Sequence, residues 1–283
     1  MTGQMMELPL LISSLIAHAD RYHGDTEIVS RTIEGPIHRT NYREAHRRAR
    51  KLATALQKLG VQPGQRVATL AWNGYRHFEA YYAISGIGAV IHTINPRLHP
   101  EQIAWIAGHA EDQYLFFDIT FAPAVEKMAA ECKTVKGWIA MTDRAHMPDI
   151  KVKNLLCYEE LVESAAEIAA WPQFDERAPA CLCYTSGTTG NPKGVQYSHR
   201  STLLHTYASA QADVFGLNGR DTILPVVPMF HVNAWAIPYS AAMCGARIVF
   251  PGSQLDGASI VELFETEKVT FSAGVPTVWL GVL

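Results

Sequence analysis

The chain has 283 residues, of which 48% are hydrophobic and 18% are charged. This length and composition predict about two folded domains with a substantial core and exclude disordered, collagen-like and coiled-coil proteins. The 24 lysines and arginines against 27 aspartates and glutamates leave a formal net charge of −3, which gives no indication of binding to nucleic acid or to anionic lipid.

Three further features of the sequence exclude other kinds of protein: the N-terminal segment, the cysteines and one uncharged segment. The N-terminal segment lacks the basic stretch and cleavage site of a signal peptide, so the cytoplasm is the expected location. Five cysteines form no CxxC pair, which argues against a zinc site or a disulfide framework. Residues 222–246 contain no Asp, Glu, Lys or Arg, but three prolines, His231 and Asn233 interrupt them. We expect a buried or pocket-lining segment there and no transmembrane helix.

The first clearly marked helix is predicted to begin at Thr40 or Asn41, with Glu44 completing the cap, and to end at Gly60. Its basic face is expected to be a solvated helix surface and not a nucleic-acid patch. Short apolar strands and helical patterns then alternate. The strands are expected at residues 66–72, 89–94, 114–118 and 138–141, and the helices at residues 77–85, from Pro100, and at 124–132. This alternation predicts βαβ units in an α/β fold, with parallel-rich sheets and helices on their faces.

A less regular stretch, residues 142–179, is predicted to connect the sublayers, with a short helix at 158–168. A second set of strands is expected at residues 180–184, 194–197, 246–250 and 269–274. The chain ends inside an apolar helical pattern, GVPTVWLGVL, without a cap or a polar tail, which indicates a fragment.

The strongest functional signal is the loop at residues 184–194, YTSGTTGNPKG. Ten residues from Thr185 include three glycines, four hydroxyl side chains and one lysine. Such a loop can direct backbone N–H groups and hydroxyls at an anion while Lys193 supplies positive charge, which suits a polyphosphate. The Walker A pattern does not fit, because Lys193 follows Pro192 and precedes Gly194. An ordinary Gly/Ser/Thr hairpin is the alternative interpretation.

Three segments together, TSGTTGNPKG from Thr185, SHRS from Ser198 and PMFHVNAW from Pro228, resemble the adenylate-forming acyl-CoA synthetases. The similarity is to fatty-acid CoA ligases of the medium- and long-chain type. INPRL from Ile94 and AGVPTVW from Ala273 agree with it. The resemblance covers nearly all of this chain but only about half of the family's length. It implies the N-terminal part of the large adenylate-forming domain. Residues 1–178 would then form an α/β subdomain, and 179–283 the phosphate loop and the start of an acyl pocket.

The resemblance also implies a two-step ligase reaction and its cofactors. A carboxylate attacks the α-phosphate of ATP, pyrophosphate leaves, and the thiol of coenzyme A takes the acyl group. ATP, Mg²⁺ and coenzyme A are the expected cofactors, and a fatty acid or a similar apolar carboxylic acid is the expected partner. A homodimer is one expected assembly, and nucleic acid is not an expected partner.

By the same resemblance, specific residues receive roles. Lys193 and His231 are the expected catalytic residues, with His231 beside the reacting carboxyl group. Thr185 is the expected ligand of Mg²⁺, Val232 lies near the nucleotide, and Trp235 resembles an aromatic gate to the acyl tunnel. The pyrophosphate end of ATP would be held by Lys193 and by Ser186, Gly187, Thr188, Thr189 and Gly190. The alternatives are a core histidine for His231, plain core packing for Trp235, and either packing or the acyl or adenine side for residues 274–277.

The substrate class follows from charge. An amino acid would need a carboxylate near its ammonium group, and residues 222–246 offer none, so an apolar acyl chain is favoured. Relatives carry downstream motifs that this chain lacks: an adenine-binding glutamate motif, a ribose-binding aspartate and a catalytic lysine. The chain alone is therefore expected to be incomplete and poorly active. The competing hypothesis is an inactive truncated fragment that serves only as a nucleotide-binding or interaction module. A luciferase-like or aryl-acid ligase is a further alternative.

Overall fold

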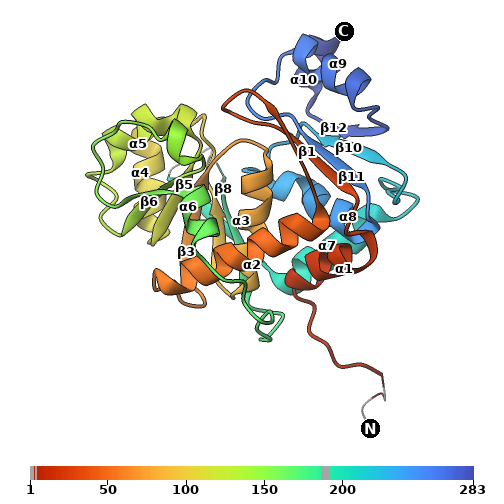
Figure 1. Ribbon diagram of the computed structural model, residues 1–283, viewed down its shortest axis with the longest axis horizontal. Coiled ribbons are helices and arrows are strands. Elements are labelled where there is room, and N and C mark those ends of the chain that lie inside the picture. Colours follow the sequence, from red (N-terminus) through yellow and green to blue (C-terminus); the bar gives the residue numbers. More distant parts are fainter. Residues whose placement is uncertain (1–2, 4, 186–190) are drawn as a thin grey trace.

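The computed structural model describes residues 3, 5–185 and 191–283. Over these residues the strands form two sheets (Figure 1). The larger is seven-stranded with the order β7-β6-β5-β3-β4-β8-β9, and all its neighbours are parallel except the antiparallel pair β8 and β9. Its strands are β3 (Arg66–Leu70), β4 (Val90–Thr93), β5 (Tyr114–Phe117), β6 (Gly137–Ala140), β7 (Leu155–Cys157), β8 (Pro179–Thr185) and β9 (Lys193–Ser198).

The smaller sheet is five-stranded, in the order β12-β10-β11-β1-β2. Its neighbours are parallel except for the β1–β2 hairpin. The strands are β1 (Glu27–Arg31), β2 (Ile37–Asn41), β10 (Thr222–Pro225), β11 (Arg247–Phe250) and β12 (Phe271–Ala273). An N-terminal hairpin thus completes a sheet whose other strands come from the last part of the chain.

Helices cover both faces of both sheets. The layer between the sheets contains α1 (Ser13–His23), α2 (Tyr42–Lys58), α3 (Tyr75–Gly86), α6 (Tyr158–Glu163), α7 (His199–Ala210) and α8 (Ile237–Cys244). The outer face of the larger sheet packs on α4 (Pro100–His109) and α5 (Ala122–Met128). The outer face of the smaller sheet packs on α9 (Gly257–Thr266) and α10 (Pro276–Val282).

Helix α3 is the centre of the middle layer. All its residues are buried, and it contacts both β4 and β1. Strand residues alternate between the two faces, as pleating requires: Ile28 faces the middle layer and Val29 the outer one, with the same alternation at Ile248 and Val249. Because each face is covered, these strands are continuously apolar.

The main sequence predictions are confirmed. The fold is α/β with parallel-rich sheets, and α2 begins at Tyr42 with Asn41 as its cap, because Asn41 Oδ1 accepts the Glu44 N–H at 2.9 Å. Strands β3 to β6 and helices α3 to α5 lie where the alternation predicts them. The sequence analysis misses α1, α7, α8, α9, β1, β2, β7 and β10.

The grouping of the later strands differs from the expectation. Strands β8 and β9 belong to the larger sheet with β3 to β7, whereas β11 and β12 belong to the smaller one. The reason is that β8 pairs in parallel with β4, a long-range contact that no local pattern specifies. The division into residues 1–178 and 179–283 stays a prediction.

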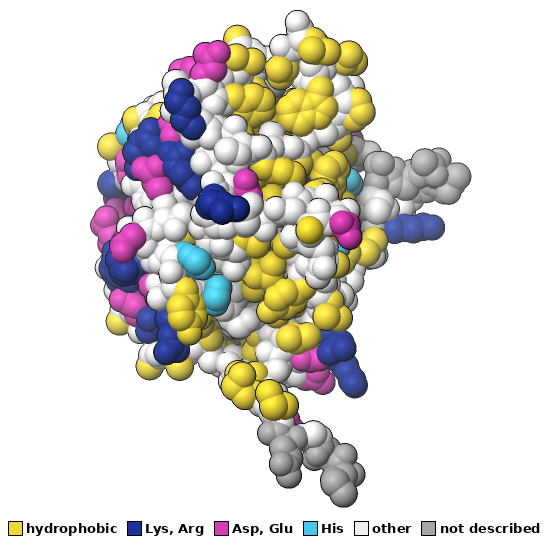
Figure 2. All heavy atoms as spheres, turned by 90° about the vertical axis from the view of Figure 1, so that its right-hand side faces the viewer, with side chains coloured by type: hydrophobic (Ala, Val, Ile, Leu, Met, Phe, Trp, Pro, Cys, Tyr) yellow, Lys and Arg dark blue, Asp and Glu magenta, His cyan; other side chains and the backbone are white. Residues whose placement is uncertain are grey.

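The uncharged segment 222–246 folds as β10, the short helix η3 (Val232–Ala236) and α8. Most of its residues are buried, which confirms the prediction of a buried segment. Among the described residues no helix combines the length and the apolar character needed to cross a bilayer. The top of the face in Figure 2 carries apolar side chains over α9 and α10. In this part of the chain Val275, Leu280 and Leu283 are exposed.

Gly252 joins the two sheets where their strands end. Its N–H donates to the carbonyl oxygen of Asn73 at 3.1 Å, in an antiparallel bridge. Its φ is +66°, and a Cβ there would lie 2.5 Å from the backbone oxygen of Arg31. Glycine is therefore required both by conformation and by close approach.

We expect Gly252→Ala to lower the free energy of unfolding by about 2 to 4 kcal/mol, because strain at positive φ adds to an overlap with backbone. The matched control is Gly60→Ala, since Gly60 has φ +87° but nothing within 4 Å of an added Cβ. It should cost about 1 kcal/mol. Urea unfolding of both variants measures the difference, and equal losses would contradict the steric account.

Candidate functional site

The glycine-rich loop is held between the ends of two paired strands. Thr185 ends β8 and Lys193 begins β9, and the two residues are register partners. The Thr185 hydroxyl donates to the Lys193 carbonyl oxygen at 3.5 Å. Both residues are exposed, so a hydroxyl and an ammonium group lie at the entrance of the loop. Ser186, Gly187, Thr188, Thr189 and Gly190 lie outside the described residues.

A left-handed turn follows His231. The five residues from Val232 to Ala236 all have positive φ, between 47° and 62°, and none is glycine. Left-handed backbone costs L-residues roughly 1 to 2 kcal/mol each. Such a turn persists only where its surroundings determine it, and here Asn233, Ala234 and Ala236 are buried.

The turn is bonded to the strand that leads into the loop. Asn233 Oδ1 accepts a hydrogen bond from the Cys181 thiol at 2.8 Å. Burial raises the pKa of Cys181, so this thiol keeps its proton and remains a donor. Thr93 at the end of β4 donates to the Phe230 carbonyl oxygen at 3.3 Å and lies 3.2 Å from Cys183 Sγ. The structure thereby connects the PMFHVNAW segment to β8, the strand that ends at Thr185.

The side chain of Asn73 holds the segment that leads into that turn. Its buried side chain donates to the carbonyl oxygens of Pro225 and Val227, at 2.9 Å each, and accepts the Met229 N–H at 2.7 Å. The Tyr81 hydroxyl donates to the Met229 carbonyl oxygen. The sequence analysis misses Asn73. One feature of the sequence could have identified it. Asn73 is a single amide side chain between the strand at residues 66–70 and the next helix, and ligands of α/β sheets bind at the carboxyl ends of the strands.

Arg97 belongs to the INPRL segment, but the sequence analysis gave it no role of its own. It follows β4, and its guanidinium carbon lies 6.0 Å from the ring centroid of Trp72 and 5.9 Å from that of Phe230. These cation–π contacts hold the Arg97 guanidinium beside Phe230, the residue before His231. The segments that form this region, 180–212 and 222–255, contain no Asp or Glu. These two segments therefore place no carboxylate that would repel an anion.

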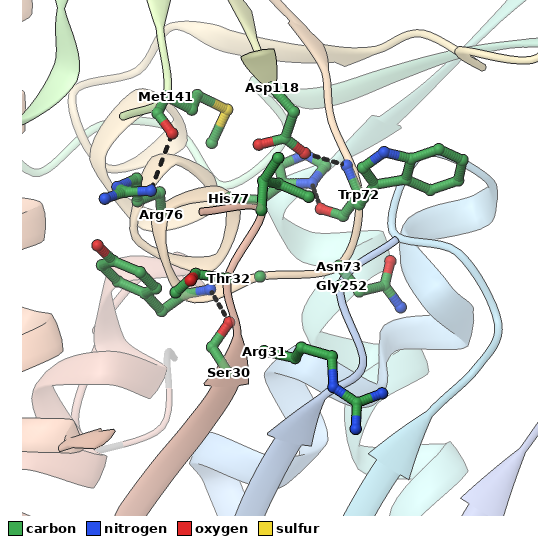
Figure 3. Close-up of a pocket in the computed structure, with 13 residues that line it drawn as sticks. Ser30, Arg31, Thr32, Trp72, Asn73, Arg76, His77, Asp118, Met141 and Gly252 are labelled. Carbon is green, nitrogen blue, oxygen red and sulfur yellow. Dashed lines mark hydrogen bonds between the residues drawn. The ribbon is translucent and has the colours of Figure 1, made fainter. Parts of the chain in front are cut away.

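A small pocket at the ends of β3 and β5 adjoins Asn73 (Figure 3). Asp118 Oδ2 accepts the Trp72 N–H at 2.7 Å, and burial raises the pKa of Asp118 to about 7. His77 donates from Nδ1 to the Trp72 carbonyl oxygen at 3.0 Å and accepts from Thr69 at 2.9 Å. Burial lowers the pKa of His77 to about 4, so it is neutral at pH 7. These groups fix the backbone of Trp72 next to Asn73.

The predicted site residues among the described residues fall into two groups. Thr185 and Lys193 form one pair, and His231, Val232 and Trp235 belong to the adjoining turn. His231 is exposed, so the alternative of a core histidine is wrong. Trp235 is half-buried and packs partly against the middle layer, which is compatible with either interpretation of it. Residues 274–277 follow Ala273, whose carbonyl oxygen accepts from the N–H groups of Val226 and Val227, both at 2.9 Å.

The chain matches the family described as AMP-binding enzyme over residues 15–283. It is 53% identical to a 3-methylmercaptopropionyl-CoA ligase of Ruegeria lacuscaerulensis. The match covers 100% of this chain and 52% of that ligase. It is 51% identical, again over 100% of the chain and 52% of the relative, to a medium-chain-fatty-acid–CoA ligase of Ectopseudomonas oleovorans. The chain spans about half the length of the curated relatives it matches. The fold is similar to that of the anthranilate CoA ligase AuaEII, solved in complex with anthranoyl-AMP, with a TM-score of 0.86 at 19% identity over 99% of this chain and 52% of that one.

The raised pKa of Asp118 predicts a pH dependence of stability. Between about pH 4 and pH 7 the native state holds a proton that the unfolded state has released, so stability falls as pH rises through this range. We expect Asp118→Asn to remove this fall in stability, because asparagine does not titrate. Relative to the wild type, the variant should gain on the order of 2 to 4 kcal/mol between pH 4.5 and pH 8.

Urea unfolding at a series of pH values measures this gain. The exposed Asp213 provides the control, because Asp213→Asn should leave the pH profile unchanged. Profiles for Asp118→Asn and wild type that run parallel would show that Asp118 is ionised in the folded protein.

Proposed function

The chain belongs to the AMP-binding enzyme family, and we propose that it carries the phosphate-loop half of a ligase that joins an apolar carboxylic acid to coenzyme A with ATP. The supporting observation is the set of hydrogen bonds that joins the PMFHVNAW segment to β4 and β8. The entrance of the phosphate loop and the turn after His231 share one support, formed by Cys181, Thr93 and Asn233. A polyphosphate bound at the loop would therefore lie at a fixed distance from a carboxylate bound near His231.

In the first step a carboxylate oxygen attacks the α-phosphorus of ATP, and the bond to the bridging oxygen of pyrophosphate breaks. In the second step the sulfur of coenzyme A attacks the acyl carbon of the adenylate and AMP leaves. The contribution of this chain is to position the reactants and to neutralise charge. Lys193 carries the positive charge for the phosphates, and the exposed His231 lies where a carboxylate can approach the turn.

Mg²⁺ fits the donor set at the entrance of the loop. Mg²⁺ prefers oxygen ligands and takes several of them from substrate phosphates and water. The exposed Thr185 hydroxyl next to Lys193 offers one such oxygen. Among the described residues no cluster of three or more His, Cys, Asp or Glu side chains could hold a metal by itself. When bound, Mg²⁺ would neutralise charge on the phosphate oxygens.

An apolar acid is the proposed substrate class. The segment around His231 has no carboxylate that could pair with an ammonium group, and the half-buried Trp235 offers an aromatic surface. The similar ligases are named for 3-methylmercaptopropionyl-CoA and for medium-chain fatty acids. Both names describe acids with a largely apolar chain, which agrees with this proposal.

The test is acid-dependent exchange between ATP and pyrophosphate. It uses the 283-residue chain and a chimaera that joins residues 1–283 to the second half of the Ectopseudomonas oleovorans ligase. We expect exchange near background for the chain alone. The chimaera should be active with 3-methylmercaptopropionate or octanoate and inactive with alanine. ATP binding without exchange in the chimaera would instead support the inactive nucleotide-binding module.

Lys193→Ala in the chimaera should lower the exchange rate by at least about a hundredfold, because a preorganised charge on the developing pyrophosphate is lost. Lys58→Ala is the matched control, since Lys58 is an exposed lysine at the end of α2. It should leave the rate unchanged. An undiminished rate in Lys193→Ala would remove Lys193 from the proposed mechanism.

Trp235→Ala should change the preference among acids of different chain length more than it changes the KM for ATP. The reason is that Trp235 belongs to the turn after His231 and not to the phosphate loop. Trp105→Ala, at a surface indole stacked on His109 at 4.8 Å, is the control. The ratio of kcat/KM for butyrate, octanoate and palmitate measures the preference, and an identical profile would indicate simple core packing.

A further inference from the structure

One tyrosine lies near the end of β8, directly before the phosphate loop. Tyr184 precedes Thr185, and its register partner on β9 is Gly194, which follows Lys193. Among the described strands β9 pairs with β8 alone, at the edge of the larger sheet, and residues 193–196 are exposed. Pairing with β8 therefore leaves the other edge of the strand that carries Lys193 without a neighbouring strand. The side chain of Tyr184 adds a restraint on this part of β9.

The ring of Tyr184 occupies the space beside Gly194. A Cβ atom at position 194 would lie 3.2 Å from Tyr184 Cζ and 3.1 Å from Leu182 Cδ1. Two carbon atoms attract each other best at roughly 3.5 to 4.0 Å, so a side chain there would have to displace its neighbours. Gly194 does not have the left-handed conformation that favours glycine. Close approach of the Tyr184 ring is therefore sufficient to explain the glycine after Lys193.

Neighbouring polar groups hold the ring in that place. The Tyr184 hydroxyl shares a hydrogen bond of 2.6 Å with Nδ1 of His109, the last residue of α4. The centroid of the Tyr184 ring also lies 5.2 Å from that of His92 on β4. His92 is fully buried and is bonded to the equally buried Asp112 at 2.7 Å. The ring thus connects β9 to α4 and to a buried polar pair at the base of the site.

A lysine is a flexible point charge, so its ammonium group is confined only as well as its backbone is. We propose that Tyr184 is a positioning residue of the phosphate loop, which fixes the strand ends that carry Thr185 and Lys193. The inference rests on the proposed function of that loop. Tyr184 acts through Gly194 and does not need to touch the phosphates. Fixing these groups before the ligand arrives lowers the cost of ordering them on binding.

Binding of inorganic pyrophosphate to the 283-residue chain, measured by isothermal titration calorimetry, tests the inference. Tyr184→Ala removes the ring and should weaken binding about tenfold, because the lysine must then be ordered by the ligand. Tyr184→Phe keeps the ring beside Gly194 and loses only the bond to His109. It should retain most of the affinity, with a loss of about threefold. Circular dichroism confirms that each variant is folded.

A second substitution tests the contact itself. Gly194→Val places a side chain in the space of the ring and should weaken pyrophosphate binding about fivefold, since residues in contact are coupled. In the Tyr184→Ala background no ring remains to be displaced, and the same substitution should have less than about a twofold effect. A direct effect of valine on the backbone or on the ligand would be equal in both backgrounds.

Tyr197→Ala is the matched control for a merely structural role. Tyr197 is the other tyrosine of the β8–β9 hairpin and is half-buried, but it packs against the middle layer. Its loss should lower the stability to urea and leave the affinity for pyrophosphate unchanged. A Tyr184 side chain that only stabilises the hairpin would give the same result as Tyr197.

Three results would each overturn the inference: no pyrophosphate binding by the wild type, wild-type affinity in a folded Tyr184→Ala variant, or an equal effect of Gly194→Val in both backgrounds. Failure of the proposed ligase function has a different signature. The chimaera would then show no acid-dependent exchange, while pyrophosphate binding by the 283-residue chain would still depend on Tyr184 and support the inference.

Discussion

Three hydrogen bonds from the side chain of Asn73 join the two halves of the structure. Asn73 follows a strand of the larger sheet, and its partners are the backbone groups of Pro225, Val227 and Met229, which extend a strand of the smaller sheet. These bonds are buried, so water cannot replace them without rearrangement. His231 and the left-handed turn follow this junction directly, so their backbone starts from a fixed point.

The left-handed turn is the most unusual product of that arrangement. A run of positive φ angles in non-glycine residues is unfavourable on its own, and the structure offsets it by burying Asn233 and Ala234 and by bonding Asn233 to Cys181. The consequence is a defined backbone at positions whose conformation would otherwise favour glycine. Strain of this kind gathers at functional sites because it fixes side chains before a ligand arrives.

Local patterns predicted those parts of the molecule that local interactions determine. The cap of α2 was identifiable because Asn41 and Glu44 are three residues apart, and the buried strands because YLFF and AVI are apolar throughout. The pairing of β8 with β4, and the hydrogen bonds of Asn73 and Cys181, join residues far apart in the chain. No periodicity specifies such contacts. His231 was selected by resemblance, and its exposure, which excludes a core role, required the coordinates.

The position of β1 has a consequence for the order of folding during synthesis. Its neighbour in the sheet is β11, and the ion pair between Glu27 and Arg247 on these strands spans 220 positions of the chain. While the ribosome makes the intervening residues, the β1–β2 hairpin has only its own turn and the adjacent helices to stabilise it, and an isolated hairpin is marginal in water. One edge of β1 stays without hydrogen-bond partners during that time, a condition that favours pairing with other chains. Hydrogen bonding on both edges of β1 is therefore possible only after β11 has been synthesised.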